Sequence, residues 1–210
     1  MSEAMVPFDG TSAAGGTAAR IGPNALLQLD PLLREAGLDR SVYAAAGIEA
    51  MPDGTGMIDE RPVARVHQEL RRIAPGRAPD LAHAAGVGTG RYILAHRIPR
   101  PAQRLLRMLP APLAARLLAR AIAANAWTFA GSGRFSVKTP FCFEIADNPV
   151  VRGETAPRPV CDWHSGVFTT LYAALAHPDM RCTETACCAA GAPACRFEIA
   201  RPSRAVTRRP

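Results

Sequence analysis

The spacing of apolar residues predicts helices in the first half of the chain. Five leucines between Pro23 and Gly37 keep returning to one face of a helix that proline can open and glycine can close. Further stretches carry apolar residues at intervals of three and four, which is typical of helices with one buried face. The elements expected here are helices over 23–37, 41–46, 61–73 and 79–98, with a loop over 51–57.

Residues 99–127 form an apolar segment studded with arginine and interrupted by Pro110 and Pro112. One helical face of this segment holds Leu113, Leu117, Leu118 and Ile122, with arginines beside it. A helix that faces the core while its arginines extend to water explains this pattern. A face for a membrane surface or a large apolar ligand is the alternative.

Beyond Gly133 the period changes to two, and apolar and polar residues alternate as in half-buried strands. We expect strands over 134–137 and 141–145, a proline-containing loop over 147–160, a helix over 161–176 and a hairpin over 180–200. The sequence therefore predicts an α+β fold, with helices packed on a small antiparallel sheet. One domain is expected over 21–200, between a disordered N-terminal segment, 1–20, and a basic flexible tail, 201–210.

Composition fits a folded domain and narrows the classes of partner. The chain has 210 residues, 48% hydrophobic and 20% charged, which is enough for one domain with its own core. It contains no apolar run long enough for a membrane span and no secretory signal, so we expect a cytoplasmic protein. The net charge of +7 comes almost wholly from arginine, four of them in the last ten residues. Without a recognition motif for nucleic acid, we expect a solvated tail, with acidic lipid or a partner protein as alternatives.

Five of the six cysteines lie between Cys161 and Cys195. In a cytoplasmic chain this clustering favours metal binding by thiolates over disulfides. Cys187 and Cys195 bracket a tight turn, and Glu184 precedes Cys187 by three residues. Odd spacing points side chains to opposite faces of a flat strand, so a bend is needed to aim both at one point. Cys161, at the start of a predicted helix, completes a set of three sulfurs and one carboxylate oxygen.

Four protein ligands leave no open position, which indicates a structural zinc ion. Three thiolates, one carboxylate and the ion sum to about −2, and Arg181 and Arg196 are expected to offset that charge. Two alternatives stay open from the spacing alone. Cys188 or His164 can replace one of the ligands, or the cysteines can be ordinary core residues.

The residues around this set resemble the signature of the 4-vinyl-reductase domain family. The similar stretches are Cys161-Asp162-Trp163-His164-Ser165-Gly166, Glu184-Thr185-Ala186-Cys187, Gly191-Ala192-Pro193-Ala194-Cys195-Arg196-Phe197 and, less specifically, 22–27 and 90–94. The resemblance covers residues 21–199 and implies that the family's zinc ligands fall on Cys161, Glu184, Cys187 and Cys195. It also implies the ligand-binding fold of NO-signalling and Golgi-transport domains, in which helices above a small sheet shelter an apolar ligand.

Within the family, this chain is similar to the stand-alone members of bacteriochlorophyll biosynthesis. That similarity implies binding of a divinyl (proto)chlorophyllide-type tetrapyrrole, nominally for reduction of its ring-B vinyl group to ethyl. Such a reduction needs a hydride or electron source, and the sequence has no nicotinamide or flavin motif. Catalysis therefore stays open beside a carrier or accessory role. The alternative is a zinc-containing sensor domain that acts through a partner protein.

The glycine-rich stretch 86–90 is a poor dinucleotide motif, because its third glycine would fall on Arg91 and no strand precedes it. Close packing of helices explains these glycines better.

A flat, apolar macrocycle suits a pocket of apolar and aromatic side chains. The candidate ligand-binding residues are Tyr92, Trp127, Phe129, Trp163 and His164, and the candidates to ligate a central magnesium are His83, His96 and His164. Each can instead be an ordinary core or surface residue. We further expect other enzymes of the pathway as partners, a homodimer, no nucleic acid, and peripheral contact with the photosynthetic membrane.

Overall fold

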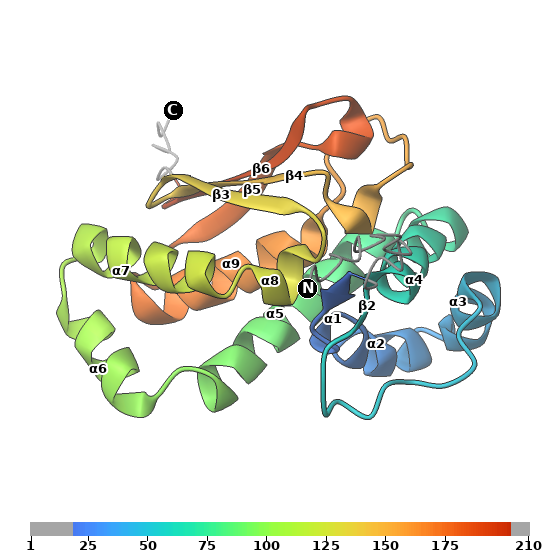
Figure 1. Cartoon of the computed structure of the whole chain (residues 1–210), viewed down its shortest axis with the longest axis horizontal. Helices are drawn as coiled ribbons and strands as arrows, with labels where there is room; N and C mark the ends of the chain where they lie inside the picture. The colour runs from blue at the N-terminus through green and yellow to red at the C-terminus, as the bar shows by residue number, and fades with distance from the viewer. Residues whose placement is uncertain (1–18, 203–210) are drawn as a thin grey trace, which may run out of the picture.

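The structure, a computed structural model, describes residues 19–202 (Figure 1). Its helices are α1 (Asn24–Leu27), α2 (Asp30–Glu35), α3 (Asp39–Ala46), α4 (Glu60–Ile73), α5 (Ala78–His96), α6 (Arg100–Met108), α7 (Ala111–Ala124), α8 (Trp127–Ala130) and α9 (Asp162–Leu175), with 3-10 turns η1 (Pro149–Val151) and η2 (Cys188–Ala190). Its strands are β1 (Arg20–Ile21), β2 (Ile58–Asp59), β3 (Arg134–Thr139), β4 (Cys142–Ala146), β5 (Arg181–Ala186) and β6 (Ala194–Ala200). The predicted α+β class is confirmed.

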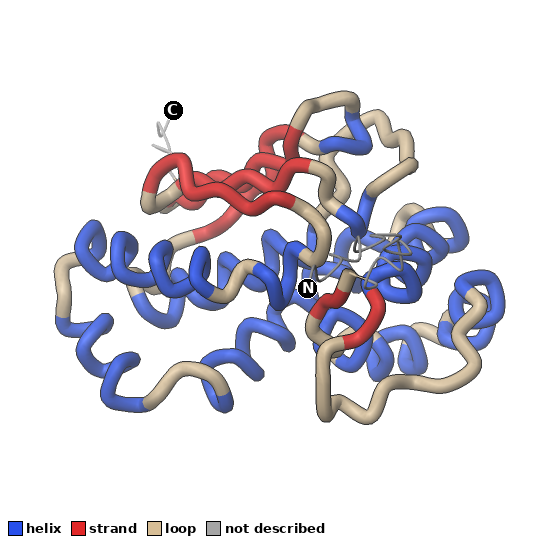
Figure 2. Tube along the Cα trace, in the orientation of Figure 1, coloured by secondary structure: helices blue, strands red, loops and turns tan. Residues whose placement is uncertain are grey.

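The larger sheet is antiparallel, with strand order β3-β4-β6-β5, and it lies over α9 and α7 (Figures 1 and 2). Buried and exposed residues alternate along β6, as expected of a strand with one face on the core. The buried face of the sheet supplies Phe143 and Phe197, whose rings pack against Phe168 of α9 at centroid distances of 5.1 and 5.4 Å. Burial of these aromatic rings fixes α9 beneath the sheet.

Helix α5 packs along the other side of α9, and glycines make this close approach feasible. A Cβ atom added to Gly86 would overlap the backbone carbonyl of Trp163, and one added to Gly166 would overlap that of His83. A Cβ atom on Gly90 would lie 2.6 Å from Cβ of Thr170. The prediction that the glycines of 86–90 serve helix packing is confirmed.

Prolines divide the predicted helices further than the sequence pattern indicated. The helix expected over 23–37 is two helices, because Pro31 occupies the first turn of a new helix, α2. The segment 99–127 contains α6 and α7, each with a proline in its first turn. Of the predicted face, Leu118 and Ile122 are buried, whereas Leu113 and Leu117 are exposed.

The two-residue strands β1 and β2, which pair Arg20 with Asp59, were not predicted. Apart from residues 19, 20, 201 and 202, the segments predicted as a disordered N-terminus and a flexible tail lie outside the described residues. Within 19–202, no helix has the length and apolar character needed to cross a membrane.

Candidate metal centre and ligand cavity

Three neighbouring elements bring Cys161, Glu184, Cys187 and Cys195 together. Cys161 is the residue before the first turn of α9, Glu184 lies in β5, Cys187 directly follows β5, and Cys195 lies in β6. The register of β5 against β6 shifts between Glu184 and Ala186, which is the bend that the odd spacing requires. One ligand atom from each of the four residues lies within 4.8 Å of the others.

The distances between the sulfur atoms fit a four-coordinate ion. The three Sγ–Sγ distances are 3.6, 3.8 and 3.9 Å. Metal–sulfur bonds of about 2.3 Å in a tetrahedron place the sulfurs about 3.8 Å apart. Oε2 of Glu184 accepts a hydrogen bond of 2.6 Å from the backbone N–H of Cys161. Its Oε1 is buried without a hydrogen-bond partner among the described residues, so this oxygen is the one available to an ion.

Burial makes the cluster unfavourable for several negative charges at once. It raises the pKa of the Cys161 thiol well above its ordinary value and raises the pKa of Glu184 to about 8. Hydrogen bonds from the thiols of Cys161 and Cys195 lower the pKa of Cys187, so one thiolate is favoured at the expense of the others. A divalent cation removes this conflict, because it stabilises all the deprotonated ligands together. The four residues could therefore hold a metal ion.

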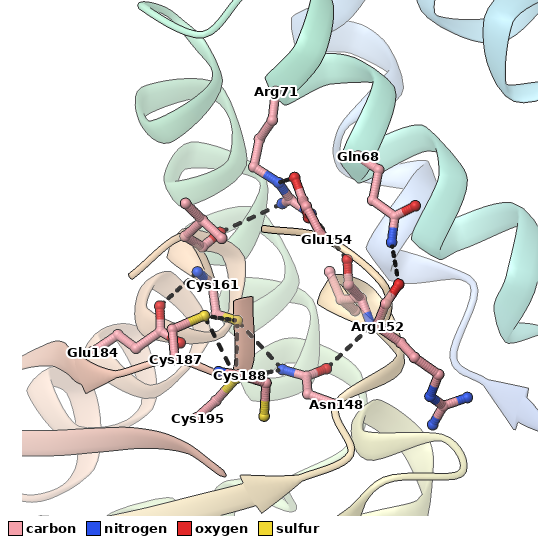
Figure 3. A network of polar contacts seen from close by, with 12 residues as sticks. Gln68, Arg71, Asn148, Arg152, Glu154, Cys161, Glu184, Cys187, Cys188 and Cys195 are labelled. Atoms are coloured by element: carbon pink, nitrogen blue, oxygen red, sulfur yellow. Dashed lines mark hydrogen bonds and ion pairs between the residues drawn. The ribbon is translucent and has the colours of Figure 1, made fainter. Parts of the chain in front are cut away.

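Hydrogen-bond donors surround the sulfur atoms (Figure 3). Nδ2 of the fully buried Asn148 lies 3.3 Å from Sγ of Cys161 and 3.5 Å from Sγ of Cys195. The backbone N–H of Cys188 lies 3.4 Å from Sγ of Cys195. Donors of this kind orient metal ligands and reduce the negative charge on thiolates.

The predicted charge compensation by Arg181 and Arg196 is not what the structure places there. The Arg196 guanidinium forms an ion pair with Glu144, and the Arg181 guanidinium donates to the carbonyls of Pro178 and Met180. Both residues are exposed, and their side chains have nearer partners at the edge of the sheet. Amide donors occupy the positions that these arginines were expected to fill.

The loop before Cys161 is fixed to α4 by Arg71, as Figure 3 shows. The Arg71 guanidinium donates to the carbonyl oxygens of Val150 and Val160 and pairs with Glu154 at 2.6 Å. This network holds the chain on both sides of η1, from which Asn148 reaches the sulfurs. The position of Cys161 is thus set before any ion binds.

The two alternative ligands lie elsewhere. Sγ of Cys188 lies 3.9 Å from the carbonyl oxygen of Ile145, pointing away from the other sulfurs (Figure 3). His164 is buried, and its Nε2 lies 3.4 Å from the carbonyl oxygen of Phe129. Its ring packs on those of Trp163 and Phe197, and burial lowers its pKa to about 4. The geometry favours Cys187 over its neighbour, while the ligand set itself stays a prediction.

A cavity of about 510 Å³ lies between the helices on the other side of α9. Helices α5, α7 and α9 form most of its wall, and the loop at 54–57 closes part of it. Its apolar lining includes Ile93, Leu118, Ile122, Val167, Phe168 and Leu171, and its only charged residue is Arg97. The volume is in the range of small-molecule sites, about 300–1,000 Å³.

Four of the five predicted ligand-binding residues line this cavity: Tyr92, Trp127, Phe129 and Trp163. Trp163 is buried and donates from Nε1 to Oγ1 of Thr89, whereas Trp127 is 59% exposed and lies at the edge. The fifth, His164, is not part of the lining, and neither are His83 and His96. A ligand in this cavity therefore meets aromatic rings but none of the three histidines considered for magnesium.

Two curated proteins are similar to this chain over most of its length. The Bacteriochlorophyll synthase 23 kDa chain of Cereibacter sphaeroides is 53% identical over 187 residues, covering 87% of this chain and 91% of the relative. The protein of the same name from Rhodobacter capsulatus is 44% identical over 186 residues, covering 86% of each. The family model of the 4-vinyl-reductase domain matches residues 141–201. The chain belongs to the 4-vinyl-reductase domain family. The matched residues include all four members of the sulfur–carboxylate cluster.

A solved structure shares the fold of this family member. It is an H-NOX protein mutant from K. algicida in the Fe(II) unliganded state, with a TM-score of 0.50 and 11% identity, covering 88% of this chain and 98% of that one. At this identity the likeness bears on the fold alone, and it confirms the predicted fold class.

Sequence reasoning missed several residues of this 4-vinyl-reductase domain that the structure places at the two sites. Asn148 carries one sequence signal, because Asn before proline is typical of a turn, but nothing in the sequence indicates its contact with sulfur. The loop residues 54–57 were predicted only as a connection. Arg97 ends α5 and had no distinguishing pattern. The cavity contact of each of these last two arises from tertiary packing.

Proposed function

We propose that this protein binds a chlorophyllide-type tetrapyrrole intermediate of bacteriochlorophyll biosynthesis and presents it to enzymes of that pathway. The observation that carries this proposal is the apolar cavity of about 510 Å³ with four aromatic residues in its wall. The names of the two relatives support the pathway and an association with its synthase. The cytoplasmic location and the homodimer predicted from the sequence remain predictions.

We propose zinc as the ion of the cluster. Three thiolates and one carboxylate form a soft donor set that suits zinc, and four protein ligands close the site to water and substrate. When bound, the ion joins the start of α9 to the end of β5 and to β6. Since α9 supplies Trp163, Val167 and Phe168 to the cavity, the ion stabilises one wall of it.

A carrier or accessory role fits the site better than independent reduction of a vinyl group. The glycines of 86–90 that would have to approach a dinucleotide are in contact with other parts of the chain. A Cβ atom on Gly88 would lie 2.7 Å from Oε1 of Gln28, and Gly86 and Gly90 face α9. The cluster has no free position for a reacting group if all four residues ligate.

Pigment titration of a cavity variant tests the binding proposal. Ala121 and Ala123 are exposed neighbours on α7, and only Ala121 lines the cavity. We expect divinyl protochlorophyllide to quench tryptophan fluorescence and shift its own absorption bands saturably at micromolar concentration. Ala121→Phe should weaken this binding about tenfold or more, since the ring occupies ligand volume, whereas Ala123→Phe should bind like the parent. Equal binding by both variants would place the ligand elsewhere, and no saturable change with the parent would refute the proposal.

Chromatography of pigments separates a carrier from an enzyme. Pure protein, divinyl substrate and NADPH should yield no ethyl product, because the described residues offer no nicotinamide site. Turnover without added flavin would overturn the carrier proposal, and turnover only with flavin would make the protein a flavoenzyme.

A further inference from the structure

The positive charge of this protein is concentrated in one stretch of the chain. Residues 81–143 contain nine basic residues and no aspartate or glutamate. The rest of the chain, with sixteen basic and eighteen acidic residues, is slightly acidic. Within the stretch, Arg134 and Lys138 form ion pairs with residues beyond it. None of the seven arginines from Arg91 to Arg120 forms an ion pair with a described residue, so their charges are uncompensated.

Exposed apolar side chains are concentrated in the same stretch. All six large hydrophobic residues that are exposed in the described part of the chain lie between residues 105 and 137. Four of them belong to α6 and α7: Leu105, Met108, Leu113 and Leu117, with Met108 83% exposed. Helix α6 has no buried residue. An amphipathic helix whose apolar residues remain in water is typical of a surface that binds something else.

The two kinds of side chain are interleaved on consecutive helices at one end of the molecule. Figure 1 shows α6 and the start of α7 at this end and α3 at the opposite end. The α6–α7 surface is defined by exposed residues Arg104, Leu105, Met108, Leu113, Arg116, Leu117 and Arg120. Helical spacing of three or four joins Arg104 to Met108, Leu113 to Arg116 and Leu117 to Arg120. Cation and apolar group are therefore neighbours along each helix.

We propose that the α6–α7 surface docks on an anionic lipid bilayer. Leucine and methionine side chains reach the boundary of the acyl chains, and arginines lie at the level of the lipid phosphates, which they bind through planar, multidentate hydrogen bonds. The proposal rests on exposed side chains and charge, and it holds whether or not the cavity binds a pigment.

Other occupants of this surface fit less well. A second copy packed symmetrically on it would bring uncompensated arginines of both copies together, which is repulsive. Single-stranded nucleic acid stacks its bases on aromatic rings, whereas the exposed apolar residues of α6 and α7 are aliphatic. Docking on lipid also has a consequence for the cavity, because α7 lines it with Leu118, Ala121 and Ile122. The bound membrane would lie next to the cavity wall.

Vesicle flotation without pigment tests this docking. The full chain should float with vesicles of phosphatidylcholine containing phosphatidylglycerol, remain unbound with pure phosphatidylcholine, and dissociate at high salt. Each arginine near an anionic surface strengthens binding about fivefold. Arg104→Glu/Arg116→Glu should therefore weaken partitioning roughly 30-fold or more. The matched control is Arg40→Glu/Arg65→Glu, which changes two exposed arginines of α3 and α4 that make no hydrogen bond or ion pair within residues 19–202.

A second variant tests the apolar part of the surface. Leu105→Ser/Met108→Ser should weaken partitioning about tenfold or more while the salt dependence persists. All variants retain the basic residues of the C-terminal segment, and all sites are exposed, so unchanged melting temperatures are expected. Flotation of the α6–α7 charge variant equal to that of the parent would overturn the proposal, as would an equal loss in the control. A parent that does not float at all would also overturn it, and would leave an acidic protein as the occupant.

Discussion

Replacement of two adjacent cysteines gives a sharp test of the metal centre. Cys187 is fully buried, with its sulfur 3.8 and 3.9 Å from those of Cys195 and Cys161. Cys188 is half-buried, and its sulfur faces a backbone carbonyl. Cys187→Ser removes a sulfur from the cluster, whereas Cys188→Ser makes the same chemical change beside it. The pair therefore separates metal binding from a general effect of losing a thiol.

The expected magnitude follows from the coupling of metal binding to folding. Structural zinc sites with four ligands contribute about 10–16 kcal/mol in small domains near neutral pH. An even division among ligands gives roughly 2.5–4 kcal/mol for one of them. In a domain of this size, such a loss lowers the melting temperature by about 5–15 °C. Cys188→Ser should change the free energy of unfolding by less than about 1 kcal/mol.

The assay combines metal analysis with thermal unfolding of both variants and the parent. We expect about one zinc per parent chain, full zinc with Cys188→Ser, and depleted zinc with a lower melting temperature for Cys187→Ser. If Cys187→Ser remains soluble, chelator treatment should destabilise it less than the parent, because less metal remains to be lost. Full zinc content and parental stability in Cys187→Ser would refute the ligand assignment.

Two further predictions concern packing and pH. Gly86→Ala should lower the free energy of unfolding by about 3 kcal/mol or more, since the new Cβ meets the rigid Trp163 carbonyl, whereas Gly76→Ala, with open space at its Cβ, should change it by less than about 0.5 kcal/mol; equal denaturant midpoints would contradict this. Burial lowers the pKa of His67 from 6.5 to about 3, so its neutral form stabilises the fold above pH 6.5, and this contribution is lost as pH falls toward 3. His67→Gln, which keeps a donor for the carbonyl of Ala25, should make stability measured by denaturant less steep in that window by up to about 1.4 kcal/mol per pH unit, and an unchanged slope would count against it.

The cluster of sulfur and carboxylate groups could be anticipated from the sequence because its geometry is local. Cys187 and Cys195 lie at the two ends of a short turn between paired strands, so hairpin pairing alone brings them close. The spacing of Glu184 required a bend, and β5 has its register shift there. The contacts of Asn148 could not be anticipated, because they depend on how the loop before α9 folds over the sulfurs.

The cavity could be anticipated only as a list of aromatic candidates. Its wall draws on segments that are far apart in sequence, including the loop at 54–57 and the end of α5. Periodicity reports which face of one helix is buried, but it does not report whether two buried faces touch or leave a space between them. For that reason Trp163 and His164, adjacent in sequence and both buried, differ in whether they meet the cavity.

Helix α9 connects the two sites and makes their properties depend on each other. Cys161 precedes its first turn and belongs to the cluster, while Trp163, Val167 and Phe168 of the same helix line the cavity. Gly166 fixes the distance of α9 from α5, so the helix cannot shift toward α5 without a backbone clash. Loss of the ion would free the first turn of α9, and Trp163 lies in that turn. Pigment affinity should therefore fall when the metal is removed, whereas docking through α6 and α7, which contribute no member of the cluster, should not.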